Sequence, residues 1–263
     1  MTPRLFAPLE LSRGTVVELD GPTSHHAIRV LRLGPGAPVE LFDGRGQAAA
    51  ATLISTSPAA VRVEDLHAPA GAPTLHLTLA QCVSAAEKMD WTIEKAVELG
   101  VVAIAPLQSQ RAIVKLSTER AARRHEHWQR LILAACAQSG QNRVPQLQPT
   151  MKLEDWLASE YAGAAGEAPA LRLILDPRAR QSLSAVMAAQ AGAASGSSAA
   201  AGLRPTRAAA VLCGPEAGFS ESELRLAGST GWLPAGLGPR VLRTETAGLV
   251  ALAVLQAGWG DLR

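Results

Sequence analysis

The chain has 263 residues, of which 48% are hydrophobic and 18% charged, and its formal net charge is +2. This composition excludes global disorder, because disordered chains are poor in apolar residues and high in net charge. The length predicts one large or two smaller domains. Three widely spaced cysteines are too few for a disulfide scaffold, so we expect a reducing, cytoplasmic setting.

The basic residues are unusual in kind. Only four of the 25 are lysines, and 21 are arginines. Arginine is the better bidentate phosphate ligand, although a coding bias toward Ala and Arg explains the same excess.

No membrane or metal partner is expected. The N-terminus lacks the apolar core of a signal peptide, and the longest apolar run, 247–255, is shorter than the roughly 20 residues that span a bilayer. No Cys/His cluster has the spacing of a zinc site.

The first seventy residues alternate short apolar stretches with turn signals. Strands are predicted over 15–19, 39–42, 49–54 and 60–63. Asp-Gly turns between them favour antiparallel hairpins. A short helix is predicted over 24–33 with Ser24 as its N-cap. The pattern predicts a small β-barrel over residues 1–70, followed by a linker at 68–73.

The remainder, residues 74–263, alternates strand-like and helix-like segments, which predicts a parallel α/β sheet with helices on both faces. The predicted strands are 75–79, 101–107, 171–176 and 208–213, and the predicted helices are 87–100, 119–139, 220–227 and 245–256. Segment 188–202 is almost entirely Ala, Gly and Ser, so we expect a surface loop there, after a short helix at 183–189.

The first candidate binding segment is Leu212–Ser220 (LCGPEAGFS), between a predicted strand and a predicted helix. Gly214 and Gly218 bracket a sharp loop, and Ser220 with Glu223 has the pattern of a capping box. Ligands of α/β proteins bind at the carboxyl ends of strands, where such loops lie. An ordinary strand–helix turn contains the same residue types, and the segment is neither a dinucleotide fingerprint nor a P-loop.

The second candidate segment is Leu237–Ala247 (LGPRVLRTETA). Gly238 predicts a tight bend, and Thr244 is the predicted N-cap of the last helix. Arg243 beside a helix N-terminus can bind an anion. Alternatively, Arg243 and Glu245 form a salt bridge and Thr244 is only a cap.

The third candidate is the basic region 111–143, with seven Lys or Arg residues against Glu119 and Glu126. At its end, Gln138, Asn142 and Arg143 can hydrogen-bond a base edge or a phosphate. The alternative is an exposed helix face with a solvated C-terminus. The amphipathic helix over 87–100 shows no catalytic pair, and no hydrolase motif is found.

Together these segments resemble the bacterial 16S ribosomal RNA uridine-N3 methyltransferases, a family of the knotted SPOUT superfamily. The resemblance covers nearly the whole chain and rests on six motifs in the same order. The motifs are Arg4–Phe6, His26–Leu33 (HAIRVLRL), Lys95–Gly100, Gln138–Pro145, Gly214–Ser220 and Leu237–Ala247.

The resemblance implies a PUA-like β-barrel over 1–70 for RNA and a SPOUT-type α/β domain over 74–263 with a C-terminal trefoil knot, which periodicity cannot predict. It implies methylation by S-adenosylmethionine of N3 of one uridine of 16S ribosomal RNA in the 30S subunit. It also implies a homodimer whose active site borrows from both subunits. The matching cofactor positions are Leu175, Leu212, Gly214, Glu216, Gly218, Leu233, Leu237, Gly238, Arg240, Val241, Leu242, Arg243, Thr244, Thr246 and Ala247, and the positions assigned to RNA are Arg4, Arg32 and Arg143.

Three positions depart from the family pattern. Ala217 stands where glycine is usual, Ala137 where a glutamate is common, and Gln141 where an arginine is common. A methyl group at residue 217 is harmless only if its φ is negative. If the missing carboxylate orients the target or holds the dimer, another group must substitute.

Uracil N3 carries a proton at neutral pH, so methyl transfer needs a base or a positive group that stabilises the uracil anion. Arg243 is the candidate for stabilising the anion, and Glu245 and Glu216 are the candidates for accepting the proton or orienting the base. Two alternatives stay open: a non-catalytic RNA-binding ribosome assembly factor on the same fold, and a SPOUT methyltransferase acting on a different RNA.

Overall fold

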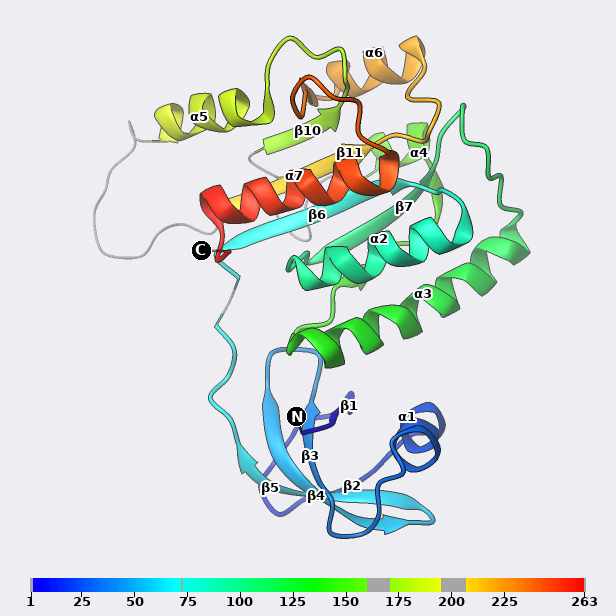
Figure 1. Ribbon diagram of the computed structural model, residues 1–263, viewed down its shortest axis with the longest axis vertical. Coiled ribbons are helices and arrows are strands. Elements are labelled where there is room, and N and C mark those ends of the chain that lie inside the picture. The colour runs from blue at the N-terminus through cyan, green and yellow to red at the C-terminus, as the bar shows by residue number, and fades with distance from the viewer. Residues whose placement is uncertain (1, 72, 160–170, 195–206, 263) are drawn as a thin grey trace. The chain divides into compact units, whose positions relative to one another are not determined.

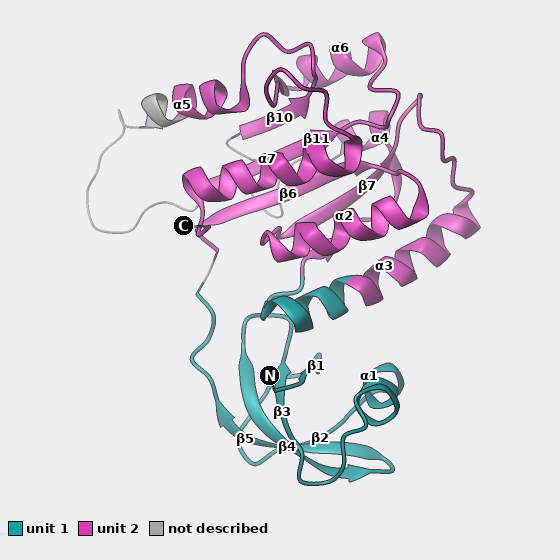
Figure 2. Cartoon of the chain, in the orientation of Figure 1, with its two compact units in different colours: residues 1–72, 132–144 teal, residues 73–131, 145–263 magenta. Residues whose placement is uncertain are grey.

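The computed structural model describes residues 2–71, 73–159, 171–194 and 207–262, without the side chains of 191–194. Contacts divide the chain into two compact units, each considered by itself (Figure 2). Unit 1 comprises residues 1–72 and 132–144, and unit 2 comprises residues 73–131 and 145–263. The sequence-based division assigned 132–144 to the second domain. The segment groups with unit 1 because Arg143 forms β-bridges with Gly44 and Arg45, and Gly46 N donates to the Asn142 carbonyl at 3.1 Å.

Unit 1 is built on a curled five-stranded sheet in the order β1-β3-β4-β5-β2 (Figure 1). The strands are β1 Arg4–Phe6, β2 Val16–Glu18, β3 Pro38–Phe42, β4 Ala48–Thr56 and β5 Ala59–Leu66. The four predicted strands are confirmed, and they pair antiparallel. The three-residue β1 was not predicted and pairs parallel to β3, so the sheet is not purely antiparallel. Because β1 and β2 end the strand order, they are the edges of the sheet.

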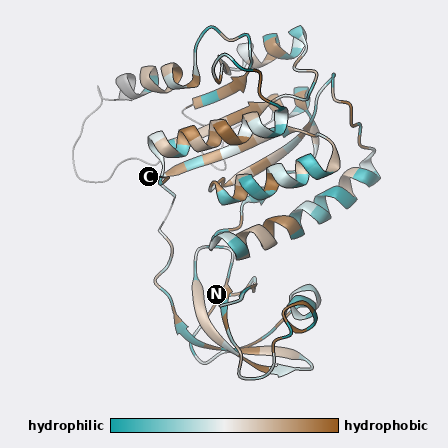
Figure 3. Cartoon of the chain, viewed as in Figure 1, coloured by the Kyte–Doolittle hydropathy of each residue, from teal (hydrophilic) through white to brown (hydrophobic). Residues whose placement is uncertain are grey.

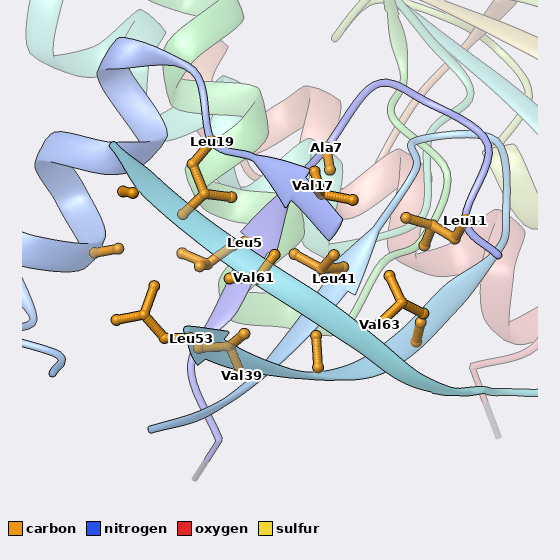
Figure 4. Packing of buried hydrophobic residues seen from close by; sticks show 14 residues of the cluster. Leu5, Ala7, Leu11, Val17, Leu19, Val39, Leu41, Leu53, Val61 and Val63 are labelled. Atoms are coloured by element: carbon orange, nitrogen blue, oxygen red, sulfur yellow. The ribbon is translucent and has the colours of Figure 1, made fainter. Parts of the chain in front are cut away.

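The core of unit 1 follows from alternation along the strands. Successive strand side chains point to opposite faces, so every second residue faces the interior. Val39 and Leu41 of β3 and Val61 and Val63 of β5 are at most 1% exposed, and they pack with Leu53 of β4 (Figure 4).

The predicted helix over 24–33 is wrong in its start and its type. An α-helix, α1, runs over Gly21–His25, and a π-helical turn follows over His26–Val30. Asp20, not Ser24, is the N-cap, and its carboxylate accepts a hydrogen bond from Thr23 N at 2.8 Å. The cap precedes a proline in the first turn, where the missing N–H costs nothing.

Unit 2 contains a parallel sheet in the order β12-β10-β11-β6-β7-β8, with β9 also paired to β7. Its strands are β6 Leu75–Cys82, β7 Ala103–Gln108, β8 Gln146–Leu147, β9 Met151–Lys152, β10 Leu171–Leu175, β11 Arg207–Cys213 and β12 Leu233–Ala235. The predicted strands and their parallel pairing are confirmed. The short strands β8, β9 and β12 were missed, because two or three residues carry no readable period.

Helices cover both faces of this sheet, as the alternation predicted. The helices are α2 Ala86–Glu98, α3 Thr118–Ser139, α4 Leu153–Leu157, α5 Leu183–Ala194, α6 Glu221–Ser229 and α7 Thr244–Trp259. Residues 132–139 of α3 belong to unit 1. On one face, Trp156 of α4 and the buried Trp232 pack over apolar residues such as Ala80 and Leu212. On the other, Gly248 brings α7 close to Leu79, and α2 lies beside α7. In Figure 3 the strands and α7 are mainly apolar, whereas α2 and α3 carry more hydrophilic residues.

Two local predictions have opposite outcomes. The capping box at the start of α6 is confirmed, because Ser220 Oγ accepts from Glu223 N and a Glu223 oxygen accepts from Ser220 N. The predicted loop at 188–202 is wrong for 188–194, which belongs to α5, and residues 195–202 lie outside the described residues. Among the described helices, none is both long and apolar enough to cross a membrane.

Trp156→Phe tests the packing beneath the sheet. The Trp156 indole donates to Gln148 Oε1 at 2.8 Å, and Gln148 is 2% exposed. Loss of the indole N–H leaves the buried Gln148 oxygen without this donor. We therefore expect the free energy of unfolding in urea to fall by about 2 kcal/mol. The matched variant Trp91→Phe, at a site 43% exposed, should change it by less than about 0.5 kcal/mol. Equal effects of the two variants would contradict the assignment.

Candidate functional site

A cavity of about 620 Å³ lies in unit 2 at the carboxyl ends of three neighbouring strands. The last residues of β10, β11 and β12, which are Leu175, Cys213 and Ala235, all contribute to its wall. The rest of the wall comes mainly from two loops: residues 214–219, which follow β11, and residues 237–243, which precede α7. The carboxyl ends of the strands are where α/β proteins bind their ligands.

Glycine shapes both loops. Gly218 and Gly238 have φ of +68° and +97°, and no heavy atom lies within 4 Å of where their Cβ atoms would stand. The backbone of both loops therefore borders open space. Gly214 serves a different purpose, because a Cβ there would lie 2.9 Å from the Phe219 ring. Ala217 has no positive φ, so its methyl group introduces no backbone strain.

Thr244 links the two loops to the sheet. Its hydroxyl donates to the Gly214 carbonyl and accepts from Gln81 Nε2 at 2.9 Å. The prediction of Thr244 as N-cap is wrong: Arg243 is the N-cap residue and Thr244 opens the helix. Its side chain serves the tertiary contact instead, and is 7% exposed.

Two carboxylates and one ammonium form a charged group at the cavity wall. Lys88 Nζ lies 3.3 Å from Glu245 Oε1 and 3.9 Å from Glu216 Oε1. Lys88 and Glu216 line the cavity, whereas Glu245 is 9% exposed and does not. The expected alternative pair of Arg243 with Glu245 is therefore wrong, because Glu245 pairs with Lys88 of α2.

The other cations of the wall differ in their contacts. Arg240 and Arg243 are exposed, and neither side chain pairs with a described residue. Arg111 donates to the Phe219 carbonyl at 3.2 Å. Arg178 pairs with Asp176 at 3.3 Å and with Glu221 at 3.2 Å. Two cations therefore remain available for an anionic group.

Cys213 places a thiol in the cavity wall. Burial raises the pKa of this thiol to about 11. It stays protonated at neutral pH, so it is a packing group and not a nucleophile.

The structure brings most of the sequence-predicted cofactor positions to this cavity. Leu212 lies in the core on the side of α4, Leu233 lies on β12 outside the wall, and Thr246 does not reach it. Those that line it are Leu175, Gly214, Glu216, Gly218, Leu237, Gly238, Arg240, Val241, Leu242, Arg243, Thr244 and Ala247.

Sequence reasoning missed several wall residues. Asp176 is the last residue of the predicted strand 171–176 and Arg178 lies just beyond it, so their position at a strand end was a usable signal. The position of Lys88 was also a usable signal, because a cation in the first turn of a helix opposes the helix dipole. Arg111 was noted only as part of the basic region 111–143, and the tertiary fold alone brings it to this wall.

The three arginines assigned to RNA lie in unit 1 and differ in exposure. The Arg4 side chain is 8% exposed: it lies 3.0 Å from Glu40, hydrogen-bonds Asn142 and stacks 5.0 Å from the Phe42 ring centroid. Those contacts give it a structural role. Arg143 is exposed and donates to the Ala70 carbonyl at 3.3 Å. Arg32 is exposed, with a φ of +55°.

Known families and proteins match the chain along most of its length. A family model described as an RNA methyltransferase domain matches residues 71–256, and one described as an RNA methyltransferase PUA domain matches residues 19–66. The chain is 27% identical to the ribosomal RNA small subunit methyltransferase E of Bacillus subtilis, over 94% of this chain and 91% of that protein.

Two solved structures are similar over 100% of both chains. One is the ribosomal RNA small subunit methyltransferase E of Neisseria gonorrhoeae bound to S-adenosyl methionine, 33% identical with a TM-score of 0.81. The other, from Legionella pneumophila, is described as a methyltransferase in complex with the bound cofactor SAM, and it is 34% identical with a TM-score of 0.84. The chain therefore belongs to the RNA methyltransferase family that includes ribosomal RNA small subunit methyltransferase E.

Proposed function

We propose that the chain transfers a methyl group from S-adenosylmethionine to N3 of one uridine of 16S ribosomal RNA in the small ribosomal subunit. The observation that carries the proposal is the cavity at the ends of β10, β11 and β12, in a chain whose 33–34% identical neighbours were solved with that cofactor. The names of the relatives support the small-subunit RNA as substrate.

The cavity has the chemistry that the cofactor requires. Leu175, Leu237 and Leu242 offer apolar surface for an adenine ring, and the open space at Gly218 and Gly238 lets a ligand approach the backbone. Charged side chains on the same wall suit an amino-acid moiety. When bound, the cofactor supplies a methyl group on positively charged sulfur.

Three side chains of the chain carry the chemistry in this proposal. Arg243, exposed on the wall and without a partner among the described residues, stabilises negative charge on the uracil. Glu216 accepts the N3 proton, because it lines the cavity. Glu245 is buried behind the wall, so it acts on the reaction through Lys88.

The further parts of the proposal concern assembly. Unit 1, which contains the PUA match, binds the RNA, and the segments around the cavity form a SPOUT-type trefoil knot. The protein acts in the cytoplasm as a homodimer in which each subunit completes the other's site. Val241 supports the dimer, because an apolar side chain 79% exposed on a cavity wall suits a surface that a second copy covers.

Thr244→Val tests the cofactor site. The substitution removes the hydrogen bonds to Gly214 and Gln81, so both loops lose their common attachment. We expect the Kd for S-adenosylmethionine, measured by calorimetry, to rise roughly 10-fold or more. Thr246→Val is the matched control, because Thr246 lies two residues further along the same helix and off the wall. Absence of binding by the wild-type protein would instead favour the assembly-factor alternative.

Arg243→Ala tests the proposed stabilisation of charge. Because the side chain is exposed and unpaired, its loss should leave thermal unfolding unchanged while kcat for methyl transfer falls roughly 100-fold. Arg225→Ala, at an exposed position of α6 off the wall, should keep full activity. Near-normal turnover of Arg243→Ala would remove this residue from the mechanism.

Arg32→Ala tests RNA binding by unit 1. An exposed arginine that contacts a phosphate contributes to the salt dependence of affinity. We expect weaker binding of small-subunit RNA, and a slope of log K against log salt that is smaller by about 1. Arg13→Ala is the control, since Arg13 pairs with Asp65 at 3.4 Å. An unchanged slope for Arg32→Ala would show that Arg32 contacts no phosphate.

A further inference from the structure

Lys88 occupies a position that local structure does not favour. It is the third residue of α2, in the first turn, where the partial positive charge of the helix N-terminus repels a cation. Its ammonium nevertheless lies at the cavity wall, 3.3 Å from Glu245 and 3.9 Å from Glu216. A residue that opposes its own helix dipole at a binding cavity suggests a role in the site.

Glu245 explains how the ammonium is held there. Its carboxylate is 9% exposed, its Oε1 faces Lys88, and its Oε2 has no hydrogen-bond partner among the described residues. A buried carboxylate with so few partners depends on the cation for its stability. Because Glu245 is behind the wall and Lys88 is on it, the pair presents a positive charge to the cavity.

We propose that Lys88 is a catalytic residue, whose ammonium stabilises the uracil anion during methyl transfer, with Glu245 as its positioning residue. The inference rests on the proposed function and adds a second cation to Arg243. It also gives the ion pair between Lys88 of α2 and Glu245 of α7 a function at the site.

The charges balance over two successive steps, a proton transfer and a methyl transfer. The N3–H bond breaks and the proton passes to the Glu216 carboxylate, while the electron pair stays on the uracil ring and spreads onto its carbonyl oxygens. Negative charge thus moves from Glu216 to the uracil ring. The Lys88 ammonium, which lies 3.9 Å from Glu216, then interacts with the negative charge on the ring. N3 then bonds to the methyl carbon as the carbon–sulfur bond breaks, and that electron pair remains on sulfur.

Lys88→Met tests the proposal with two substrates. Small subunits are assembled on RNA transcribed with uridine or with 5-fluorouridine, whose N3 proton is more acidic because fluorine withdraws electrons. We expect kcat on uridine to fall roughly 100-fold. The loss should be several-fold smaller on 5-fluorouridine, because an easier deprotonation needs less help from the cation. Lys88→Arg should retain most of the activity, since it keeps the charge.

Two further variants separate this role from folding. Lys88→Met leaves the buried Glu245 carboxylate unpaired, which can destabilise the fold. The double variant K88M/E245Q removes both charges. It should show the same substrate-dependent loss of kcat with the thermal stability of the wild type. Lys95→Met is the matched control, because Lys95 lies in the same helix, pairs with Glu98 at 2.6 Å and is off the wall. It should behave as wild type on both substrates.

The outcomes are distinct. A wild-type protein that methylates neither substrate contradicts the proposed function, and the role of Lys88 with it. An active wild type with an equally active K88M, or with equal losses for K88M on the two substrates, overturns the role of Lys88 alone.

Discussion

The site depends first on one side chain, the hydroxyl of Thr244. It donates to the carbonyl of Gly214 at the end of β11 and accepts from Gln81 at the end of β6. The start of α7 is thereby held against two strands, and the loop before it faces the loop after β11. The bond to Gln81 is buried and Thr244 is 7% exposed. Loss of a partner would therefore leave a polar group unsatisfied in the interior, which favours one fixed arrangement.

Around this attachment, glycines shape the loop backbones and charged side chains line the cavity. Gly218 and Gly238 keep the backbone of both loops open to a ligand, while Gly214 allows the Phe219 ring to close over its own loop. The charged side chains then differ by depth. Glu245 lies behind the wall, whereas Lys88 is half-buried on the wall and Arg243 is exposed on it. The buried Glu245 carboxylate thus holds the Lys88 ammonium at the cavity wall.

The excess of arginine over lysine has more than one cause. Several arginines hold the protein's own fold: Arg4 stacks on Phe42, Arg172 donates to the Thr230 carbonyl at 2.9 Å, and Arg207 lies 4.8 Å from the Trp259 ring centroid. A planar guanidinium suits such stacked and multiply bonded positions better than an ammonium. Others, such as Arg32 and Arg243, remain exposed. Composition alone could not separate these two groups of arginines, because it does not show which side chains are buried in the folded protein.

The sequence by itself determined the layers of the fold and the two loops of the site. Long apolar periods predicted β6, β7, β10 and β11 with their helices, and the motif around Gly214 correctly predicted a loop at the end of a strand. Tertiary structure alone decided what periodicity cannot express. The Thr244 side chain forms a tertiary hydrogen bond with Gln81 and does not cap the helix. The partner of Glu245 is Lys88 and not Arg243, and residues 132–144 group with unit 1. The reason is physical: a local pattern fixes which face a residue shows, whereas a distant partner is chosen by packing that brings remote segments together.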